Sequence, residues 1–328
     1  MMPVAKVTRA LHVLFSEDPA IRTGRNLSGW GERFLGLNMS QTRTLVHAWK
    51  NVRNPVSAIR HYALAKRRGI GAGSDRALDL SEGCAPFDAN QIEGGTEVVK
   101  LLQRLFQERC VDQIHPGFSW AKKNGKMKEF LRDCFFEDDF IKYPELADFV
   151  LNDTFLQSAI RYFGAVPRLG SIQFWWSPAN SLQIGSQNWH FDDEDRRQLK
   201  VFMNVFEVTE TNGPLTFLPA STSRRIRDEP THKVGRLEDA AVDAILNGTK
   251  PTQAVGPGGA GYLVDTVSCL HQGSRTQAGD RVVMMIQFIP HNVHRESKAP
   301  PRFDASRYLN DPVRHLIASG TEAAYRHN

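Results

Sequence analysis

Cysteine is scarce in this sequence, and no two cysteines stand close enough to form a CxxC pair. The 328 residues contain four, at Cys84, Cys110, Cys134 and Cys269. This spacing fits neither a zinc ribbon nor a disulfide framework. We therefore interpret the cysteines as reduced, mostly buried small residues.

Long apolar runs and a secretory signal are also missing. No run approaches the roughly 18 residues that a membrane span requires. The opening residues, MMPVAKVTRALHVLFSED, lack a proper apolar stretch and a small-residue cleavage site. Hydrophobic residues make up 41% of the chain and charged residues 23%, as in ordinary globular proteins. We expect a cytoplasmic protein.

Acidic residues are absent from residues 43–68, which carry seven Lys or Arg interleaved with apolar side chains. Pro55 divides this stretch into two short helices at most. One interpretation is a surface that meets an anionic lipid or an acidic partner. The other is a pair of helices that pack their apolar side on the main domain and leave a solvated basic face.

The apolar pattern changes along the chain. Residues 1 to about 95 look mainly helical and irregular, and residues 96–112 and 145–164 repeat apolar positions at helical spacing. From about residue 168, short runs rich in β-branched and aromatic residues alternate with turn residues. These runs are SIQFWWS, LKVFMNVFEV, PLTFLP, GYLVDTV and RVVMMIQFIP. They predict an antiparallel sandwich or barrel, with a short helix inserted over residues 232–250.

A metal site is indicated by Trp189-His190-Phe191-Asp192 together with the distant His271. In a strand, residues i and i+2 point to the same face, so His190 and Asp192 can reach one ion. His271 would complete a set of two imidazoles and one carboxylate. This set leaves coordination positions open, as non-haem Fe(II) oxygenases require, although zinc, manganese or cobalt would also be tolerated.

Arg281 stands ten residues beyond His271 and opens an apolar strand. Its fork of donors matches a carboxylate. A hydrogen bond to a charged group contributes roughly 1.5–3 kcal/mol. Arg281 is therefore a candidate anchor for the far carboxylate of 2-oxoglutarate.

In these segments the sequence resembles the phytanoyl-CoA dioxygenase-like Fe(II)/2-oxoglutarate oxygenases. The matching elements are the His-x-Asp, the Leu-Lys-Val-Phe strand that follows, the Asn-Gly-Pro-Leu turn, and the His with an Arg ten residues on. Together they span about 115 residues, from roughly 173 to 290. The ordered set is far more specific than His-x-Asp alone.

The resemblance implies a mainly β fold with flanking helices (α+β): a double-stranded β-helix, or jelly-roll and cupin-like barrel, with a helical N-terminal region. We divide the chain into a basic, mostly helical region (1–95), a dioxygenase domain (96–300) and a C-terminal tail or helix (301–328).

The resemblance also assigns roles to site residues. It implies Fe(II) ligation by His190, Asp192 and His271, and 2-oxoglutarate binding by Arg281. Two weaker transfers place Thr216 near the cosubstrate and Gln173 in the active site. Relatives often carry a Ser at the position of Gly273, so Ser274 or Thr216 would have to supply any hydroxyl that assists the arginine.

The implied activity is hydroxylation, or a related oxidation, of a C–H bond in a small-molecule substrate. It would consume O₂ and 2-oxoglutarate and release succinate and CO₂, with ascorbate as a candidate reductant. Halogenating relatives replace the carboxylate ligand with a small residue, so Asp192 favours hydroxylation. The basic residues of 43–68 and of the insert 221–250 raise the hypothesis of an anionic or lipid-linked substrate; those of the insert are Arg224, Arg225, Arg227 and Lys233.

Three alternatives stay open. The first is a nucleic-acid dealkylating oxygenase, which the basic charge and the pair Arg275 and Arg281 suggest. Arg275, however, lies too close to His271 in the sequence for that family. We therefore expect no nucleic-acid partner. A jelly-roll binding protein with a vestigial iron site is the second alternative, and a zinc- or manganese-dependent cupin-like enzyme the third. His291 and His294 form a weak candidate for a second metal site.

Overall fold

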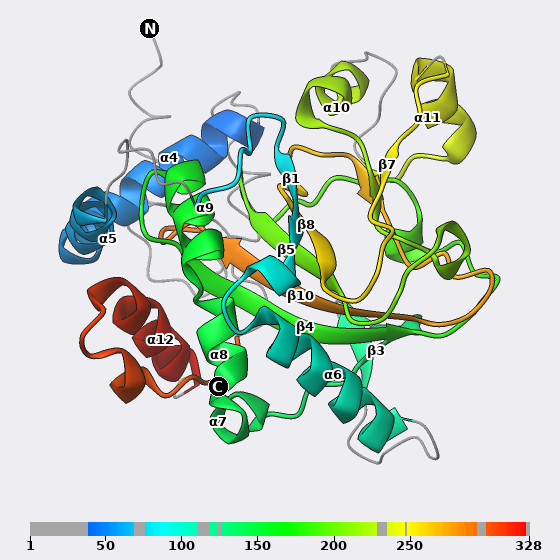
Figure 1. The fold of residues 1–328 in the computed structure, drawn as a ribbon. Helices are drawn as coiled ribbons and strands as arrows, with labels where there is room; N and C mark the ends of the chain where they lie inside the picture. Colours follow the sequence, from blue (N-terminus) through cyan, green and yellow to red (C-terminus); the bar gives the residue numbers. More distant parts are fainter. Residues whose placement is uncertain are drawn as a thin grey trace, which may run out of the picture.

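The structure is a computed structural model that describes residues 39–68, 76–110, 119–123, 126–227, 235–246, 248–293 and 300–325. Its helices and strands are shown in Figure 1. In chain order they are α4 (Met39–Arg53), α5 (Pro55–Arg67), β1 (Cys84–Asp88), α6 (Gly95–Cys110), β2 (Ser119–Lys123), β3 (Lys126–Asp133), α7 (Asp139–Lys142), α8 (Pro144–Val150), α9 (Asp153–Phe163), β4 (Arg168–Ser177), β5 (Leu199–Asn204), β6 (Thr216–Phe217), α10 (Ala220–Arg227), α11 (Asp239–Leu246), β7 (Thr252–Gln253), β8 (Ala260–Val264), β9 (His271–Gln272), β10 (Arg281–Ile289) and α12 (Pro312–Tyr325).

Two antiparallel sheets form the centre of the molecule. The large sheet has the order β1-β8-β5-β10-β4-β3-β2 and the small sheet the order β7-β6-β9. A bridge between His190 and His271 adds the segment around His190 to the small sheet. From β4 to β10 the chain passes repeatedly between the two sheets, which is the connectivity of a jelly roll. The predicted double-stranded β-helix with flanking helices is confirmed.

Strand β10 shows how the two faces of the large sheet differ. Its even-numbered apolar residues, such as Met284 and Phe288, join the core cluster shared with α6, α8, α9 and α12. Its odd-numbered residues Val283 and Met285 join a second cluster with Phe217 of the small sheet. Because side chains alternate along a strand, the space between the sheets is lined by the odd-numbered residues. This space is called the barrel interior below.

The helical pattern over residues 145–164 forms two helices rather than one. Asn152 ends the continuity, because its side-chain oxygen accepts a 2.9 Å hydrogen bond from the backbone N–H of Phe155 and so caps α9. Gly164 adopts φ 71° just after the last helical residue, as expected of a helix stop. The helix predicted over 96–112 is α6.

Several elements were not predicted. Strand β1 lies in the region expected to be helical and irregular, and strands β2 and β3 precede the predicted strand region. These strands occupy the outer positions of the large sheet. Helix α10 also lacked a prediction, whereas α11 falls within the predicted insert at 232–250.

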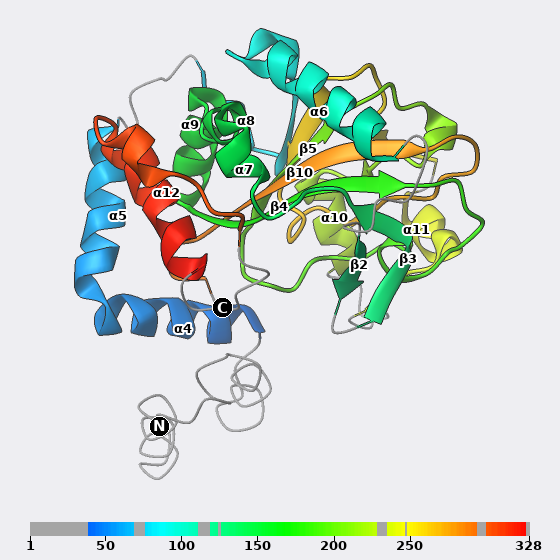
Figure 2. The ribbon, with the colours of Figure 1, turned by 90° about the horizontal axis from the view of Figure 1, so that it is seen from below.

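Helices α4 and α5 meet at a bend beside α12 (Figure 2). Pro55 is the first residue of α5, and the side chain of Asn54 caps it by accepting from the N–H of Ser57. The break at Pro55 is therefore confirmed. Residues 1–38 lie outside the described part of the chain, and the division at 95 and 300 stays a prediction. None of the helices in the described segments combines the length and hydropathy that a membrane crossing needs.

Candidate metal centre

His190 and His271 lie opposite each other on neighbouring segments of the small sheet. The backbone N–H of His190 donates to the carbonyl of His271 at 2.9 Å, and the reverse bond measures 3.1 Å. The two ring centroids are 4.2 Å apart. Antiparallel pairing of this kind places both imidazoles on one face of the sheet.

Each imidazole is oriented by a carbonyl two residues earlier in the chain. Nδ1 of His190 lies 2.8 Å from the carbonyl oxygen of Asn188, and Nδ1 of His271 lies 3.1 Å from that of Cys269. A carbonyl only accepts, so Nδ1 carries the proton in both rings and Nε2 presents a lone pair. This arrangement is typical of histidines that bind a metal through Nε2.

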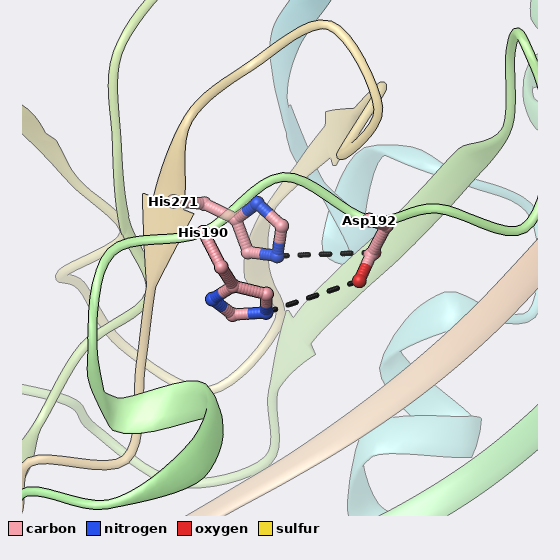
Figure 3. Close-up of side chains that lie close together, drawn as sticks. All are labelled: His190, Asp192 and His271. Atoms are coloured by element: carbon pink, nitrogen blue, oxygen red, sulfur yellow. Dashed lines mark ion pairs between the residues drawn. The ribbon is translucent and has the colours of Figure 1, made fainter. Parts of the chain in front are cut away.

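Asp192 faces Nε2 of both histidines (Figure 3). Its carboxylate oxygens lie 3.8 Å from Nε2 of His190 and 3.8 Å from Nε2 of His271. One potential ligand atom from each of the three residues lies within 4.8 Å of the others. In the described residues, this is the one group of three or more His, Cys, Asp or Glu side chains close enough to hold an ion.

Two side chains donate hydrogen bonds to the carboxylate of Asp192: Lys200 of β5, and Gln198 just before that strand. Lys200 Nζ and Gln198 Nε2 both lie 2.7 Å from Oδ2 of Asp192. Gln198 in turn accepts from Gln287, which accepts from Ser171. A chain of polar side chains therefore runs through the barrel interior from β4 to Asp192.

The electrostatics favour an ionised carboxylate and a neutral imidazole. Burial alone would raise the pKa of Asp192, but Lys200 and the two histidines outweigh it, so the pKa lies well below its usual range. The pKa of His190 is lowered to about 3, mainly by burial and to a smaller extent by the neighbouring His271. Both groups are thus in the protonation state that a metal requires at neutral pH.

Arg281 is buried at the start of β10 and is poorly satisfied. Its Nη1 donates to Ser274 Oγ at 3.3 Å, and its Nε has no hydrogen-bond partner in the described part of the chain. Burial lowers the pKa of its guanidinium to about 10. A buried guanidinium without a carboxylate is costly, so a neighbouring anionic group would stabilise it.

Gly273 lies beside the guanidinium of Arg281. A Cβ atom added to this glycine would lie 3.5 Å from Arg281 Nη1. Gly273 is two residues beyond His271, so in an extended chain both project to the same side. Ser274 has φ 63°, an unusual value for a residue with a side chain. It supplies the hydroxyl next to the arginine, one of the two alternatives that the sequence left open.

The side chain of Gln173 faces the barrel interior, whereas that of Thr216 points away from the histidines. Gln173 pairs with Met285 across β4 and β10 and so faces the barrel interior, where its amide donates to Asp133 at 3.4 Å. Thr216 pairs with Gln272, one residue out of step with the inward-facing pair of Phe217 and His271. By alternation Thr216 projects away from the histidines, and its hydroxyl donates to the carbonyl of Pro214.

Helix α4 holds the loop that follows Asp192. The guanidinium of Arg43 donates to the backbone carbonyls of Asp193 and Asp195, each at 2.6 Å. Nε2 of His47 lies 2.7 Å from the buried carboxylate of Asp195. The basic region thus contributes to the framework of the candidate site.

Other residues named from the sequence lie apart from the triad. His291 stacks on His61 with ring centroids 4.8 Å apart, and His294 lies outside the described residues. Arg275 forms an ion pair of 2.7 Å with Asp239. In the described segments, neither His291 nor Arg275 joins a metal-binding group.

Three supporting residues escaped the sequence analysis: Lys200, Gln198 and Gln287. Lys200 follows a general rule that could have identified it, because a lysine in an otherwise buried strand needs an anionic partner. The two glutamines carried no comparable signal. Their roles depend on the register between β5 and β10, which pairs Lys200 with Gln287.

Comparisons with known proteins give distant similarities. No protein-family model matches the sequence, and no curated protein matches it significantly. Among solved structures, the non-haem alpha-ketoglutarate-dependent carbocyclase SnoK from nogalamycin biosynthesis is 12% identical, over 63% of this chain and 79% of that one, with a TM-score of 0.41. EctD from S. alaskensis with bound Fe is 13% identical, over 68% and 75%, with a TM-score of 0.44.

HygX from Streptomyces hygroscopicus, solved with nickel, 2-oxoglutarate and hygromycin B, is 16% identical, over 64% of this chain and 83% of that one, with a TM-score of 0.40. Similarities of this size assign no function, so we base the function on the geometry of the site.

Proposed function

We propose that this protein is a non-haem Fe(II)- and 2-oxoglutarate-dependent dioxygenase that hydroxylates, or otherwise oxidises, a C–H bond of a small molecule. The observation that carries this proposal is the convergence of His190, Asp192 and His271. Two imidazoles and one carboxylate with open positions are typical of non-haem Fe(II) oxygenases.

The donor set fits a divalent metal. Both Nδ1 atoms are occupied by carbonyls, so the Nε2 lone pairs of His190 and His271 face the carboxylate of Asp192. Lys200 places a positive charge beside them, 2.7 Å from Oδ2 of Asp192. Bound iron would supply the O₂ chemistry that no side chain can perform.

Arg281 is the feature that favours 2-oxoglutarate over a simple metal site. Its unpartnered Nε and its weak bond to Ser274 leave donors for a carboxylate. Gly273 borders the same guanidinium, so a residue at this position lies beside the proposed carboxylate site. A dicarboxylate with one end toward the triad and the other end on Arg281 would satisfy both features.

The chain's own residues would hold and shield the reacting groups. Lys200 and Gln198 keep Asp192 ionised and fix its direction. The apolar interior cluster, including Phe217 and Val283, excludes water from the space behind the histidines. We propose Gln173 as a further contact to the cosubstrate from the inward face of β4, whereas the outward direction of Thr216 argues against that role for it.

The substrate class is a narrower part of the proposal. Basic side chains on α10 border the small sheet. The guanidinium carbon of Arg227 lies 4.2 Å from the ring centroid of Phe191, the residue between His190 and Asp192 in the sequence. A cation beside the ligand segment would favour an anionic or amphiphilic small molecule.

Succinate release is the test. Purified protein is given 2-oxoglutarate and O₂ with Fe(II), Zn(II) or Mn(II), and succinate is measured over time without added substrate. Slow release with Fe(II) alone, abolished by Asp192→Ala and retained by His315→Gln on α12, supports the proposal. If no metal gives succinate while the protein still binds a small ligand, the vestigial binding-protein alternative is correct. Activity that depends on zinc or manganese without 2-oxoglutarate would indicate the cupin-like alternative.

A further inference from the structure

Exposed apolar side chains concentrate on helices α4 and α5. Five of the nine large hydrophobic side chains that are exposed in the described residues belong to these two helices. They are Leu45, Val52, Val56, Ile59 and Tyr62. Val52 is 78% exposed and Val56 is 76% exposed, on either side of the bend at Pro55. Clusters of exposed apolar residues on a soluble domain mark interaction sites.

The basic residues of the same segment divide into two groups. Three of them point into the molecule: Arg43 binds the carbonyls of the 193–195 loop, Lys50 donates to the carbonyl of Val293, and Arg68 pairs with Asp311 at 2.7 Å. These contacts attach the helices to the core. They account for the part of the basic charge that serves the fold.

The other four basic residues, Arg53, Arg60, Lys66 and Arg67, are exposed. None of them forms an ion pair or a hydrogen bond with a side chain in the described part of the chain. Arg53 lies over the ring of Trp49 at 5.2 Å, which leaves its charge at the surface. No acidic residue occurs between residues 43 and 68 to balance them. The exposed apolar residues are therefore flanked by uncompensated positive charge.

We propose that this surface, defined by Leu45, Val52, Arg53, Val56, Ile59, Arg60, Tyr62, Lys66 and Arg67, binds the surface of an anionic phospholipid membrane. Helices with aliphatic side chains flanked by Lys and Arg lie in the interface between lipid headgroups and acyl chains. The cations are attracted to anionic headgroups, and the aliphatic side chains enter the region below them. Such binding does not require a membrane-spanning helix, and it is independent of the metal centre.

Charge and shape favour this occupant over two others. In a symmetric pair of copies, the same surface meets itself, so Arg53, Arg60 and their neighbours would face one another and repel. A protein partner usually anchors aromatic residues in a groove, whereas four of the five exposed apolar residues here are aliphatic: Leu45, Val52, Val56 and Ile59. A flat anionic surface meets neither objection.

Flotation with vesicles tests the proposal on the full-length chain. Vesicles of phosphatidylcholine alone are compared with vesicles that also contain phosphatidylglycerol, at low and at high salt. We expect binding to the anionic vesicles only, weakened by salt because the attraction is partly electrostatic. The metal is left out, so failure of the oxygenase proposal would not affect the result.

Two variants test the surface: one replaces apolar side chains by carboxylates, and the other removes positive charge. The triple variant Val52→Glu, Val56→Glu and Ile59→Glu should abolish vesicle binding. Replacement of Arg53, Arg60, Lys66 and Arg67 by Gln should weaken it at least about a hundredfold, since each cation contributes about fivefold. All these side chains are exposed, so the fold should persist, which circular dichroism and urea unfolding would verify.

Matched controls make the result specific. Leu309→Glu changes an apolar residue that is 68% exposed on another part of the molecule. Replacement of the exposed Lys100, Arg104, Lys142 and Lys250 by Gln removes the same charge elsewhere. Both controls should bind vesicles like the unmodified protein. Equal binding to neutral and anionic vesicles, or equal loss in a control and its matched variant, would overturn the proposal. So would light scattering that shows a dimer dissociated by the triple variant, which would assign the surface to a second copy.

Discussion

The ammonium group of Lys200 lies 2.7 Å from Oδ2 of Asp192, and both side chains are almost entirely buried. Burial alone would favour the neutral form of both groups. The ion pair outweighs this effect, because Asp192 raises the pKa of Lys200 and Lys200 lowers the pKa of Asp192. The carboxylate that we propose as a metal ligand is therefore ionised before any metal ion arrives. Lys200 also fixes the carboxylate in a direction that faces the two histidines.

Replacement of Lys200 by Met should weaken metal binding. Loss of a group that orients a metal ligand typically reduces affinity about 10- to 100-fold. Anaerobic calorimetry with Fe(II), or with Co(II) as a stable substitute, measures this. The same variant leaves Asp192 buried without its cation and should lose about 3 kcal/mol in the free energy of unfolding of the apo protein.

The double variant Lys200→Met and Asp192→Asn distinguishes the two effects. It removes both charges, so most of the apo stability should return in urea unfolding, while metal binding should stay lost. If the single variant binds Co(II) as tightly as the unmodified protein, Lys200 does not position the ligand.

Replacement of Arg281 by Lys should reduce the affinity for 2-oxoglutarate and leave Fe(II) affinity nearly unchanged. A lysine keeps the charge but loses the fork that binds a carboxylate through two hydrogen bonds. The loss of about 1.5–3 kcal/mol corresponds to roughly 10- to 150-fold in the dissociation constant. Titration of 2-oxoglutarate into the Fe(II) protein under nitrogen measures it. Equal affinity in the two proteins would remove Arg281 from the cosubstrate site.

Ser274 and Gly273 allow a test by exchange. Ser274→Ala removes the hydroxyl that accepts from Arg281 at 3.3 Å and should weaken 2-oxoglutarate binding several-fold, since a hydrogen bond contributes about 0.5–1.5 kcal/mol. A Cβ at Gly273 would make only ordinary contacts. The double variant Gly273→Ser and Ser274→Ala should therefore fold and recover part of the affinity. Failure to recover any would show that the hydroxyl is unimportant for binding.

The pH dependence of stability should reflect His291, outside the metal site. Burial lowers the pKa of this imidazole to about 4, whereas the unfolded chain titrates near 6.5. Between these values the unfolded state takes up a proton that the folded state does not, so stability is complete above about pH 6.5 and falls as the pH drops toward 4.

His291→Gln should lessen that fall. The imidazole is partly exposed, and its expected contribution between pH 7 and pH 5 is about 1 kcal/mol. Urea unfolding of the apo protein at the two pH values gives the difference. Parallel losses in the variant and the unmodified protein would contradict the account.

The barrel and the triad could be predicted because their signals are local or strongly ordered. Alternating β-branched and aromatic runs indicate strands, and His-x-Asp needs only the two-residue period of a strand to bring its side chains together. The role of His271 came from the ordered resemblance. Its contact with His190 depends on pairing between segments far apart in the chain.

The missed features depend on register and on capping. Gln287 reaches Gln198 because β5 and β10 pair in one register, which no local pattern encodes. Asn152 divides a continuous helical pattern because its side chain caps α9. The spacing of apolar residues alone does not distinguish such a cap from a polar residue in the middle of a helix. The outward direction of Thr216 follows from its pairing with Gln272, one residue out of step with His271.

Diffraction from crystals grown under nitrogen with Fe(II) and 2-oxoglutarate tests the central claim most directly. We predict one iron ion bound by Nε2 of His190, Nε2 of His271 and the carboxylate of Asp192, with the far carboxylate of 2-oxoglutarate on Arg281. Iron bound elsewhere, or an ordered 2-oxoglutarate that does not touch the guanidinium, would contradict it.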